Sequence, residues 1–279
     1  MVNKPSAMET AMKNILLLLH DDVGQEARLQ AALDLTRSLD GHLTCLDVAI
    51  LPALMGDPYC QDGSAILLQE ERAREDVNQS RIRERLDRED VSWEIAQVTG
   101  DLAPCLSDAA GLADLIVVNR KLDEFPYPDM ANLVGELVVK SGKPVIAVPD
   151  DIRSFNAAGR AIVAWDGSPA SMAALQAATP LLKLSESVII VEIDDGSLKT
   201  PAREAAAYLS QHGIHALIRL EKSHGRSAGD ILLSEIRDRS IDYLVMGGFG
   251  HRRFVEALFG GVTRTLLEKS PVPLFLAHG

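Results

Sequence analysis

A cluster of glycines near the C-terminus is the part of this sequence best suited to bind an anion. Gly247, Gly248 and Gly250 directly follow a short apolar run, and a second pair, Gly260 and Gly261, begins ten residues after Gly250. Glycines at the carboxyl end of a strand let a ligand approach the backbone, and amides at a helix N-terminus favour phosphate. The spacing therefore predicts a phosphate cradle, although the glycines taken alone fit a tight turn equally well.

Two other side chains in the second half could serve the same ligand. Asp166 opens the segment Asp166-Gly167-Ser168-Pro169, where its carboxylate could accept hydrogen bonds from a ribose or help to hold a metal beside phosphates. The alternative is a turn residue that caps the next helix, because this segment has good turn chemistry. Thr263 could offer a hydroxyl at the entry to the last helix, or could simply cap that helix.

The sequence offers no catalytic or metal-binding constellation. His212 and His215 lie on either side of a glycine, so they do not share a face of one element. Ser168 has no predictable base near it, and neither a nucleophile-elbow motif nor a lysine-bearing phosphate loop occurs. We therefore expect no catalytic residues and no metal site made by the protein alone.

The composition of the chain limits the kinds of partner that the protein is expected to bind. The formal net charge of the 279 residues is −12, and an acidic surface repels nucleic-acid backbones. No apolar run approaches the length of a membrane span, and the first twelve residues lack the apolar core of a secretory signal. The three cysteines are scattered, which is typical of free thiols. We expect a cytoplasmic protein that binds neither nucleic acid nor membrane.

Extended and helical patterns alternate along the first 150 residues. The apolar runs predict strands at 14–19, 43–50, 91–98, 115–118 and 144–149, and helices at 25–39, 65–90, 101–111 and 129–141. This alternation implies right-handed crossovers and a parallel sheet.

The same order restarts after a polar, irregular segment at 150–159. Strands are predicted at 161–165, 188–193, 215–220, 243–246 and 272–277, with helices at 170–182, 200–212, 228–237 and from 262 onward. The chain therefore predicts two tandem doubly wound, Rossmann-like five-stranded parallel-sheet domains, at 1–150 and 151–279.

Matched positions indicate that the two halves are copies of one unit. Asp166 lies 145 residues after Asp21, and Glu192 lies 145 after Asp47, whereas Pro273 lies only 129 after Pro144. The offset falls by about the length of a short helix between the second and fourth strands. The first copy therefore carries extra chain, which we place around residues 51–90.

These motifs together resemble the universal stress protein family. The family has an Asp-Gly-Ser after the first strand, matched by 166–168, and a Gly-x2-Gly-x9-Gly-[Ser/Thr] loop after the fourth, matched by 247–260. The closing strand resembles 272–276. The resemblance covers residues 160–278, and through the repeat it extends to 13–149, so the chain looks like a tandem member of an adenine nucleotide alpha hydrolase-like fold.

The resemblance implies which residues bind a nucleotide. Asp166 would meet the ribose or phosphates, the backbone of Ile193 would contact adenine, and Met246 with Gly247 would line the adenosine pocket. The residues implied around the phosphates are Gly250, Gly260, Gly261, Val262 and Thr263. ATP or AMP is the implied ligand, with Mg²⁺ as an accompanying ion.

The chain departs from the family pattern at Gly261, where ATP-binding members have Ser or Thr. A hydrogen bond to a charged group contributes roughly 1.5–3 kcal/mol, so its loss would weaken ATP binding about tenfold or more. The first copy departs further, because Asn119-Arg120-Lys121-Leu122 stands where the second has glycines. We expect that copy to have lost its nucleotide site, although Asp21 persists, and to serve as a structural partner.

The family pairs domains through the last strand, which implies that 144–148 and 272–277 pair within this chain as an intramolecular pseudo-dimer. A homodimer of the whole chain is also left open. The first hypothesis is a stress-response protein that binds an adenine nucleotide in its C-terminal domain. The second is a scaffold or interaction protein without nucleotide, and the third is an enzyme, at most a slow ATPase.

Overall fold

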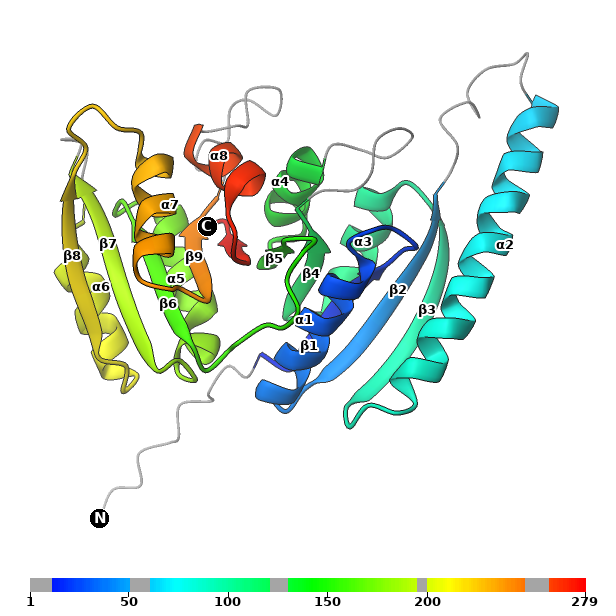
Figure 1. The fold of residues 1–279 in the computed structure, drawn as a ribbon, viewed down its shortest axis with the longest axis horizontal. Helices are drawn as coiled ribbons and strands as arrows, with labels where there is room; N and C mark the ends of the chain where they lie inside the picture. Colours follow the sequence, from blue (N-terminus) through cyan, green and yellow to red (C-terminus); the bar gives the residue numbers. More distant parts are fainter. Residues whose placement is uncertain (1–11, 51–60, 121–129, 195–199, 249–260) are drawn as a thin grey trace.

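The computed structural model of the protein describes residues 12–50, 61–120, 130–194, 200–248 and 261–279. Within these ranges, ten strands form one continuous sheet in the order β3-β2-β1-β4-β5-β10-β9-β6-β7-β8 (Figure 1). Each half contributes five neighbouring strands, and the order in the second half mirrors that in the first. The predicted fold class, two doubly wound α/β units, is confirmed.

The elements follow the predicted alternation. The first unit contains β1 (Asn14–Leu19), α1 (Gln25–Ser38), β2 (His42–Ile50), α2 (Gln61–Leu86), β3 (Ser92–Gly100), α3 (Leu102–Ala109), the 3₁₀ turn Ala110–Leu112, β4 (Leu115–Asn119), α4 (Met130–Ser141) and β5 (Val145–Val148). The second contains β6 (Arg160–Trp165), α5 (Pro169–Leu182), β7 (Ser187–Asp194), α6 (Ala202–Gln211), β8 (Ala216–Lys222), α7 (Ala228–Asp238), β9 (Tyr243–Gly247), α8 (Gly261–Lys269) and β10 (Leu274–Ala277).

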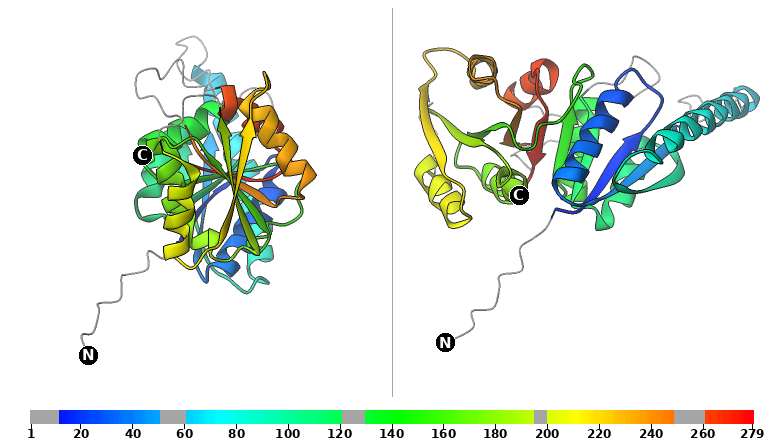
Figure 2. Two further views of the ribbon diagram at one scale, coloured as in Figure 1. Left: turned by 90° about the vertical axis from the view of Figure 1, so that its left-hand side faces the viewer. Right: turned by 60° about the horizontal axis from the view of Figure 1, so that its bottom comes forward.

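The central strands read as continuous apolar runs because both faces of the sheet are covered. In β1, Leu17 enters the core on one face and Leu18 enters the core on the other, and neither side chain is exposed. The helices α1, α2, α5 and α6 contribute to the first core, and α3, α4, α7 and α8 to the second. Figure 2 shows helices packed on both sides of the twisted sheet.

The two units join through their last strands, as the family resemblance implied. β5 and β10 are antiparallel neighbours, with Ile146 opposite Phe275, whereas the other strand pairs in the sheet are parallel. Both strands are shorter than predicted, because β5 begins only after Pro144 and β10 only after Pro273. A proline has no backbone N–H to donate to a ladder, so these residues delay the start of a strand.

The segment between the units is irregular, as predicted, and although several of its residues are exposed, part of it packs against both units. Phe155 is only 4 % exposed, and its ring lies 5.4 Å from that of Tyr243 in the second unit. Its amide donates a hydrogen bond of 2.9 Å to Asp34 Oδ2 of α1 in the first unit. The segment therefore connects the two units by packing as well as by the chain.

The extra length of the first unit lies in α2. This helix has 26 residues, whereas its counterpart α6 has 10. It begins at Gln61, earlier than the predicted start at Ala65, and so includes Gly63. A glycine inside a helix costs about 1 kcal/mol relative to alanine, which is too little to end a helix of this length.

Candidate functional site

Four of the predicted ligand residues lie together at one edge of the sheet. Trp165 at the end of β6 is paired with Glu192 of β7, so Asp166 and Ile193 each follow one residue later on adjacent strands. On the other side of β6, Ala164 is paired with Met246, which places Gly247 beside the end of β6. This is the carboxyl edge of three parallel strands, where open α/β sheets bind ligands.

Asp166 is exposed at this edge and closes the turn into α5. Its Oδ1 accepts a hydrogen bond of 2.9 Å from the amide of Ser168. The helix cap itself is Ser168, whose hydroxyl oxygen accepts a hydrogen bond of 3.1 Å from the Ser171 amide. Capping is therefore not the role of Asp166, and its exposed carboxylate lies where a ligand could reach it.

Gly247 is required by packing. A Cβ at this position would lie 2.5 Å from the backbone of Ala170 and Ser171, so only glycine allows β9 to meet the first turn of α5. Gly167 is constrained in a similar way, with a φ of +68° and the Thr200 backbone 2.5 Å from a Cβ. The tight-turn and ligand interpretations of these glycines are thus compatible.

Two residues outside the predicted ligand set also shape this edge. Glu192 is 8 % exposed, and its Oε2 accepts a hydrogen bond of 2.6 Å from the amide of Ala202, the first residue of α6. Trp165 Nε1 donates a 2.8 Å hydrogen bond to the carbonyl of Thr200. Together they fix the start of α6 to the ends of β6 and β7. In the sequence, this role of Glu192 was indicated by its position near the end of an apolar strand.

The remaining predicted residues lie on or before α8. Gly261 is its exposed first residue, Val262 is half-buried, and Thr263 is 6 % exposed. Among the residues that the structure describes, none has an atom within 4 Å of a Cβ placed at Gly261. Gly250 and Gly260 fall in the segment 249–260, outside the described residues, so the predicted loop between Gly248 and Gly261 stays a prediction.

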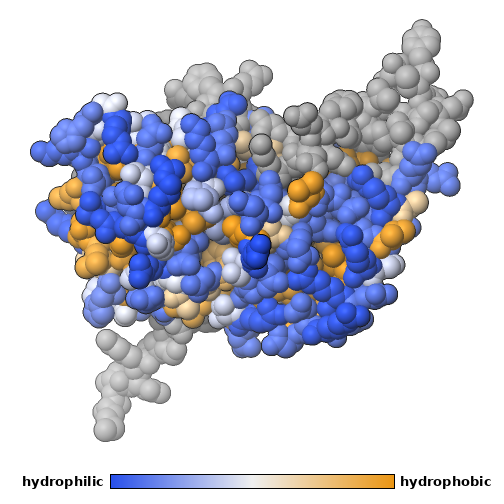
Figure 3. Space-filling view, in the orientation of Figure 1, coloured by the Kyte–Doolittle hydropathy of each residue, from blue (hydrophilic) through white to orange (hydrophobic). Residues whose placement is uncertain are grey.

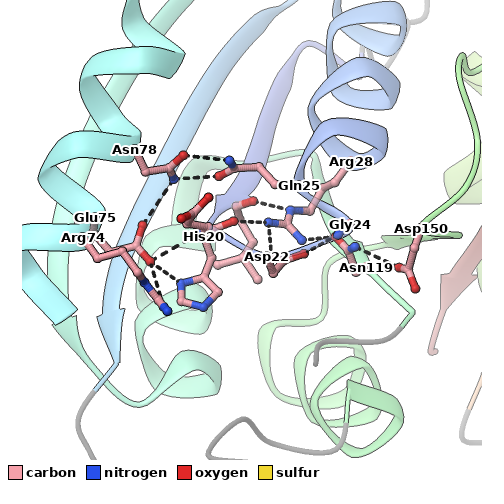
Figure 4. A network of polar contacts seen from close by, with 12 residues as sticks. His20, Asp22, Gly24, Gln25, Arg28, Arg74, Glu75, Asn78, Asn119 and Asp150 are labelled. Atoms are coloured by element: carbon pink, nitrogen blue, oxygen red, sulfur yellow. Dashed lines mark hydrogen bonds and ion pairs between the residues drawn. The ribbon is translucent and has the colours of Figure 1, made fainter. Parts of the chain in front are cut away.

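The corresponding edge of the first unit is filled by its own side chains (Figure 4). Asn119, at the end of β4, stands where Gly247 ends β9. Its Nδ2 donates a 3.0 Å hydrogen bond to Asp150 Oδ1, and it occupies the space into which a Cβ on Gly24 would project. Side-chain atoms therefore lie where the second unit has a bare glycine backbone.

A fully buried arginine completes this filling. Arg28 projects from α1 and donates hydrogen bonds to the carbonyls of Leu18 (2.6 Å) and His20 (3.0 Å), to Asp22 Oδ2 (2.8 Å) and to Asn119 Oδ1. Asp22 and Asn119 thus satisfy a cation that has no access to solvent. Arg28 lies directly beside the apolar stripe of α1, and that position was the available indication of its burial.

The long helix α2 covers the same edge. Glu75 Oε1 lies 2.6 Å from His20 Nδ1, with side-chain exposures of 2 % and 0 %. The side chains of Asn78 and Gln25 exchange two hydrogen bonds of 2.8 Å. Burial disfavours the ionised form of Glu75, but hydrogen bonds and the charge of His20 outweigh it, so the pKa of Glu75 is lowered.

Asp47 lies next to this pair, at the position that Glu192 occupies in the second unit. Burial raises its pKa to about 6, with the negative charge of Glu75 acting in the same direction, while a 3.3 Å hydrogen bond from Gln97 opposes the shift. The first unit therefore has two buried acidic residues, Asp47 and Glu75, close together. At the position of Asp47, the second unit has Glu192, which binds the first amide of α6.

A cavity of about 380 Å³ lies between α1 and α2 in the first unit, near the carboxyl end of β1. It is lined by Asp21, Asp22, Val23, Gln25, Glu26, Arg81, Ile82 and Arg85. Its carboxylates are already ion-paired, for example Asp21 with Arg81 at 3.0 Å. The cavity is therefore the space between α1 and α2, and we assign it no ligand.

Comparison with known proteins identifies the second unit. Residues 158–278 match the sequence model of the Universal stress protein family. This half of the chain is a universal stress protein domain. The first half repeats the strand order of this domain, so the two halves share one fold.

Relatives of known name agree with this assignment. A universal stress protein of Synechocystis sp. is 24% identical over 190 residues, which span 66% of this chain and 64% of that protein. The crystal structure of a universal stress protein from Archaeoglobus fulgidus is similar to 95% of this chain, over 96% of its own length, with a TM-score of 0.74 and 16% identity. A putative universal stress protein from Pseudomonas aeruginosa covers 96% of this chain and 94% of its own, with a TM-score of 0.56 and 16% identity.

The structural likenesses show that both halves of the chain share the fold of these proteins. At such low identity they establish the fold alone. No helix in the described ranges has both the length and the apolar composition needed to cross a membrane.

Proposed function

We propose that this universal stress protein binds an adenine nucleotide at the carboxyl edge of β6, β7 and β9 in its C-terminal unit. One contrast between the units carries the proposal. The edge formed by Asp166, Ile193 and Gly247 has an exposed carboxylate and a glycine backbone, whereas Arg28 and Asn119 fill the equivalent edge of the first unit.

Each residue at this edge offers a defined interaction. The exposed carboxylate of Asp166 suits the two hydroxyls of a ribose, and the backbone of Ile193 offers an N–H and a C=O to an adenine ring. The N-terminus of α8, at Gly261 and Val262, suits phosphate through its amides and its dipole. A Mg²⁺ ion that arrives with ATP would be held chiefly by the phosphates and by one carboxylate, for which Asp166 is the candidate.

The test is calorimetric titration of the full chain with ATP, AMP and adenosine. The repeat supplies a matched pair of variants, because Asp21 and Asp166 occupy equivalent positions. We expect Asp166→Ala to abolish binding of all three ligands. We expect Asp21→Ala to leave binding unchanged, because Asp21 lies beside the filled edge and is ion-paired with Arg81.

Two results would count against the proposal. Titrations of the wild-type protein without heat, repeated at two temperatures and supported by equilibrium dialysis, would favour the second hypothesis of a scaffold without nucleotide. Gly261, which lacks the hydroxyl of ATP-binding relatives, is the observation on which that alternative rests. Loss of binding in Asp21→Ala but not in Asp166→Ala would place the ligand in the first unit.

A further inference from the structure

The strand at one end of the sheet exposes an unusual number of large apolar side chains. Leu217, Ile218 and Leu220 of β8 are 68 %, 43 % and 68 % exposed. They are three of the eight exposed large hydrophobic residues in the part of the chain that the structure describes, and they lie within one strand of seven residues. Figure 3 shows hydrophobic residues gathered at the end of the molecule where Figure 1 places β8.

The backbone of β8 is also unpaired along one side. It is the last strand of the sheet, paired in parallel with β7 from Ala216 to Lys222. The strand at the opposite end, β3, exposes none of the large hydrophobic residues counted among the described positions. Open N–H and C=O groups beside exposed apolar side chains are a template for pairing with a further strand.

The sequence of β8 is self-complementary when two copies of the strand pair in an antiparallel arrangement. If two copies pair with Leu220 opposite Leu220, Arg219 of each copy lies opposite Glu221 of the other. On the other face, Leu220 lies opposite Leu220, and Ile218 of each copy lies opposite Lys222 of the other, whose methylene chain is apolar. Opposite charges and apolar pairs that face each other across strands stabilise a sheet, and like charges in the same positions destabilise it.

The side chains that this register requires are accessible. Arg219 is 42 % exposed and Glu221 26 % exposed, and within one chain they form an ion pair of 2.7 Å. Arg219 also lies 2.9 Å from Glu235 of α7, which holds the guanidinium near the free edge. A shift of the register by one residue would place Arg219 opposite Leu220 and lose both cross-strand ion pairs.

We propose that β8 is a dimerisation edge, at which two copies of this chain pair antiparallel through Ile218–Lys222, with Leu220 on the two-fold axis and Arg219 facing Glu221. The two ten-stranded sheets then form one continuous sheet. The interface is independent of the β5–β10 pairing that joins the two units of one chain, and it does not depend on nucleotide binding.

Charge exchange tests this register. Arg219→Glu sets two pairs of acidic residues against each other in the homodimer, and Glu221→Arg sets two pairs of arginines. We expect sedimentation equilibrium to show a dimer for the wild-type chain and at least a tenfold weaker dimer for each single variant. The double variant R219E/E221R restores the ion pairs, and so does an equimolar mixture of the two single variants, which should form heterodimers.

Leu220→Lys supplies a test that leaves these charges in place. It should also separate the dimer, whereas Val23→Lys, at an apolar side chain 75 % exposed in the first unit, should not. Circular dichroism shows whether each variant is folded. Formation of heterodimers on mixing is a second check, because it requires both single variants to be folded. A wild-type chain that stays monomeric at high micromolar concentration, or a dimer that none of these substitutions weakens, would overturn the proposal.

Discussion

Arg120 of the first unit donates a hydrogen bond of 2.8 Å from Nη1 to the carbonyl oxygen of Leu267, in the last turn of α8 in the second unit. Burial lowers the pKa of the Arg120 guanidinium, while Asp150 and Asp151 oppose that shift. A cation at a helix C-terminus interacts favourably with the helix dipole. The first unit, which we expect to have lost its nucleotide site, therefore holds the C-terminal end of α8. The N-terminal end of the same helix, at Gly261, belongs to the predicted phosphate site of the second unit.

Replacing Arg120 by glutamine should loosen this connection. A hydrogen bond from a charged donor contributes roughly 1.5–3 kcal/mol, and we expect urea unfolding to show a loss of that order. Lys140→Gln removes an exposed side chain that pairs with Glu136 on the same helix and should have little effect. Equal stability of the wild-type and Arg120→Gln chains would show that the bond does not contribute.

The fully buried Arg28 should be far more important for stability than the exposed Arg81. Arg28→Leu leaves the carboxylate of Asp22, whose side chain is 2 % exposed, without its cation, and breaking a buried pair in this way costs about 3–5 kcal/mol. Arg81→Leu breaks an exposed pair with Asp21 and should cost less than about 1 kcal/mol. Chemical denaturation of both variants measures the difference, and similar losses would contradict the proposed filling.

Asp47 should make the folded protein less stable as the pH rises through its raised pKa. The folded-state pKa is about 6 and the ordinary value is 3.8, so the native state binds more protons between these values. Stability therefore falls from about pH 4 to pH 6, and above pH 6 the ionised Asp47 costs about 3 kcal/mol, at about 1.4 kcal/mol per pKa unit. Asp47→Asn should remove this slope and be more stable than the wild type at pH 7.

Glu75 acts in the opposite direction and in a lower window. Its pKa is lowered from 4.5, so its contribution to stability is lost as the pH falls below that value. Unfolding measured from pH 4.5 to 8 avoids the Glu75 window, and the difference between the wild-type and Asp47→Asn profiles removes the contribution of groups common to both chains, such as the histidines. Asp40→Asn, at a side chain 98 % exposed, is the control and should leave the profile unchanged. An Asp47→Asn profile parallel to that of the wild type would refute the assignment.

Gly261→Ser should strengthen ATP binding if the second unit holds a nucleotide. The described residues leave open space around a Cβ at this position, and a serine hydroxyl donated to a charged phosphate should raise the affinity about tenfold. Adenosine has no phosphate, so its affinity should not change. Titration with both ligands separates the two effects, and an equal gain for adenosine would mean that the residue acts on the fold and not on phosphate.

Much of the fold could be predicted because apolar periodicity is a local property. The runs at Ile15–Leu19 and Tyr243–Met246 are buried on both faces, and this requirement appears directly in their composition. Errors fell at the ends of elements, where the prolines at 144 and 273 shortened two strands and where α2 continued through Gly63. Element ends depend on single hydrogen bonds and on packing, which a run of apolar residues does not specify.

The sequence by itself determined that the chain is a duplicated α/β unit, that its last strands could pair, and that Asp166, Ile193 and Gly247 end neighbouring strands of the second copy. Only the tertiary structure decided how the first copy is closed. Arg28 and Asn119 are 91 residues apart, and Gln25 and Asn78 are 53 apart. Whether such side chains meet depends on the register of the strands and the placement of α2, which long-range packing sets. The exposed edge of β8 has the same origin, because it depends on which strand the sheet leaves without a neighbour.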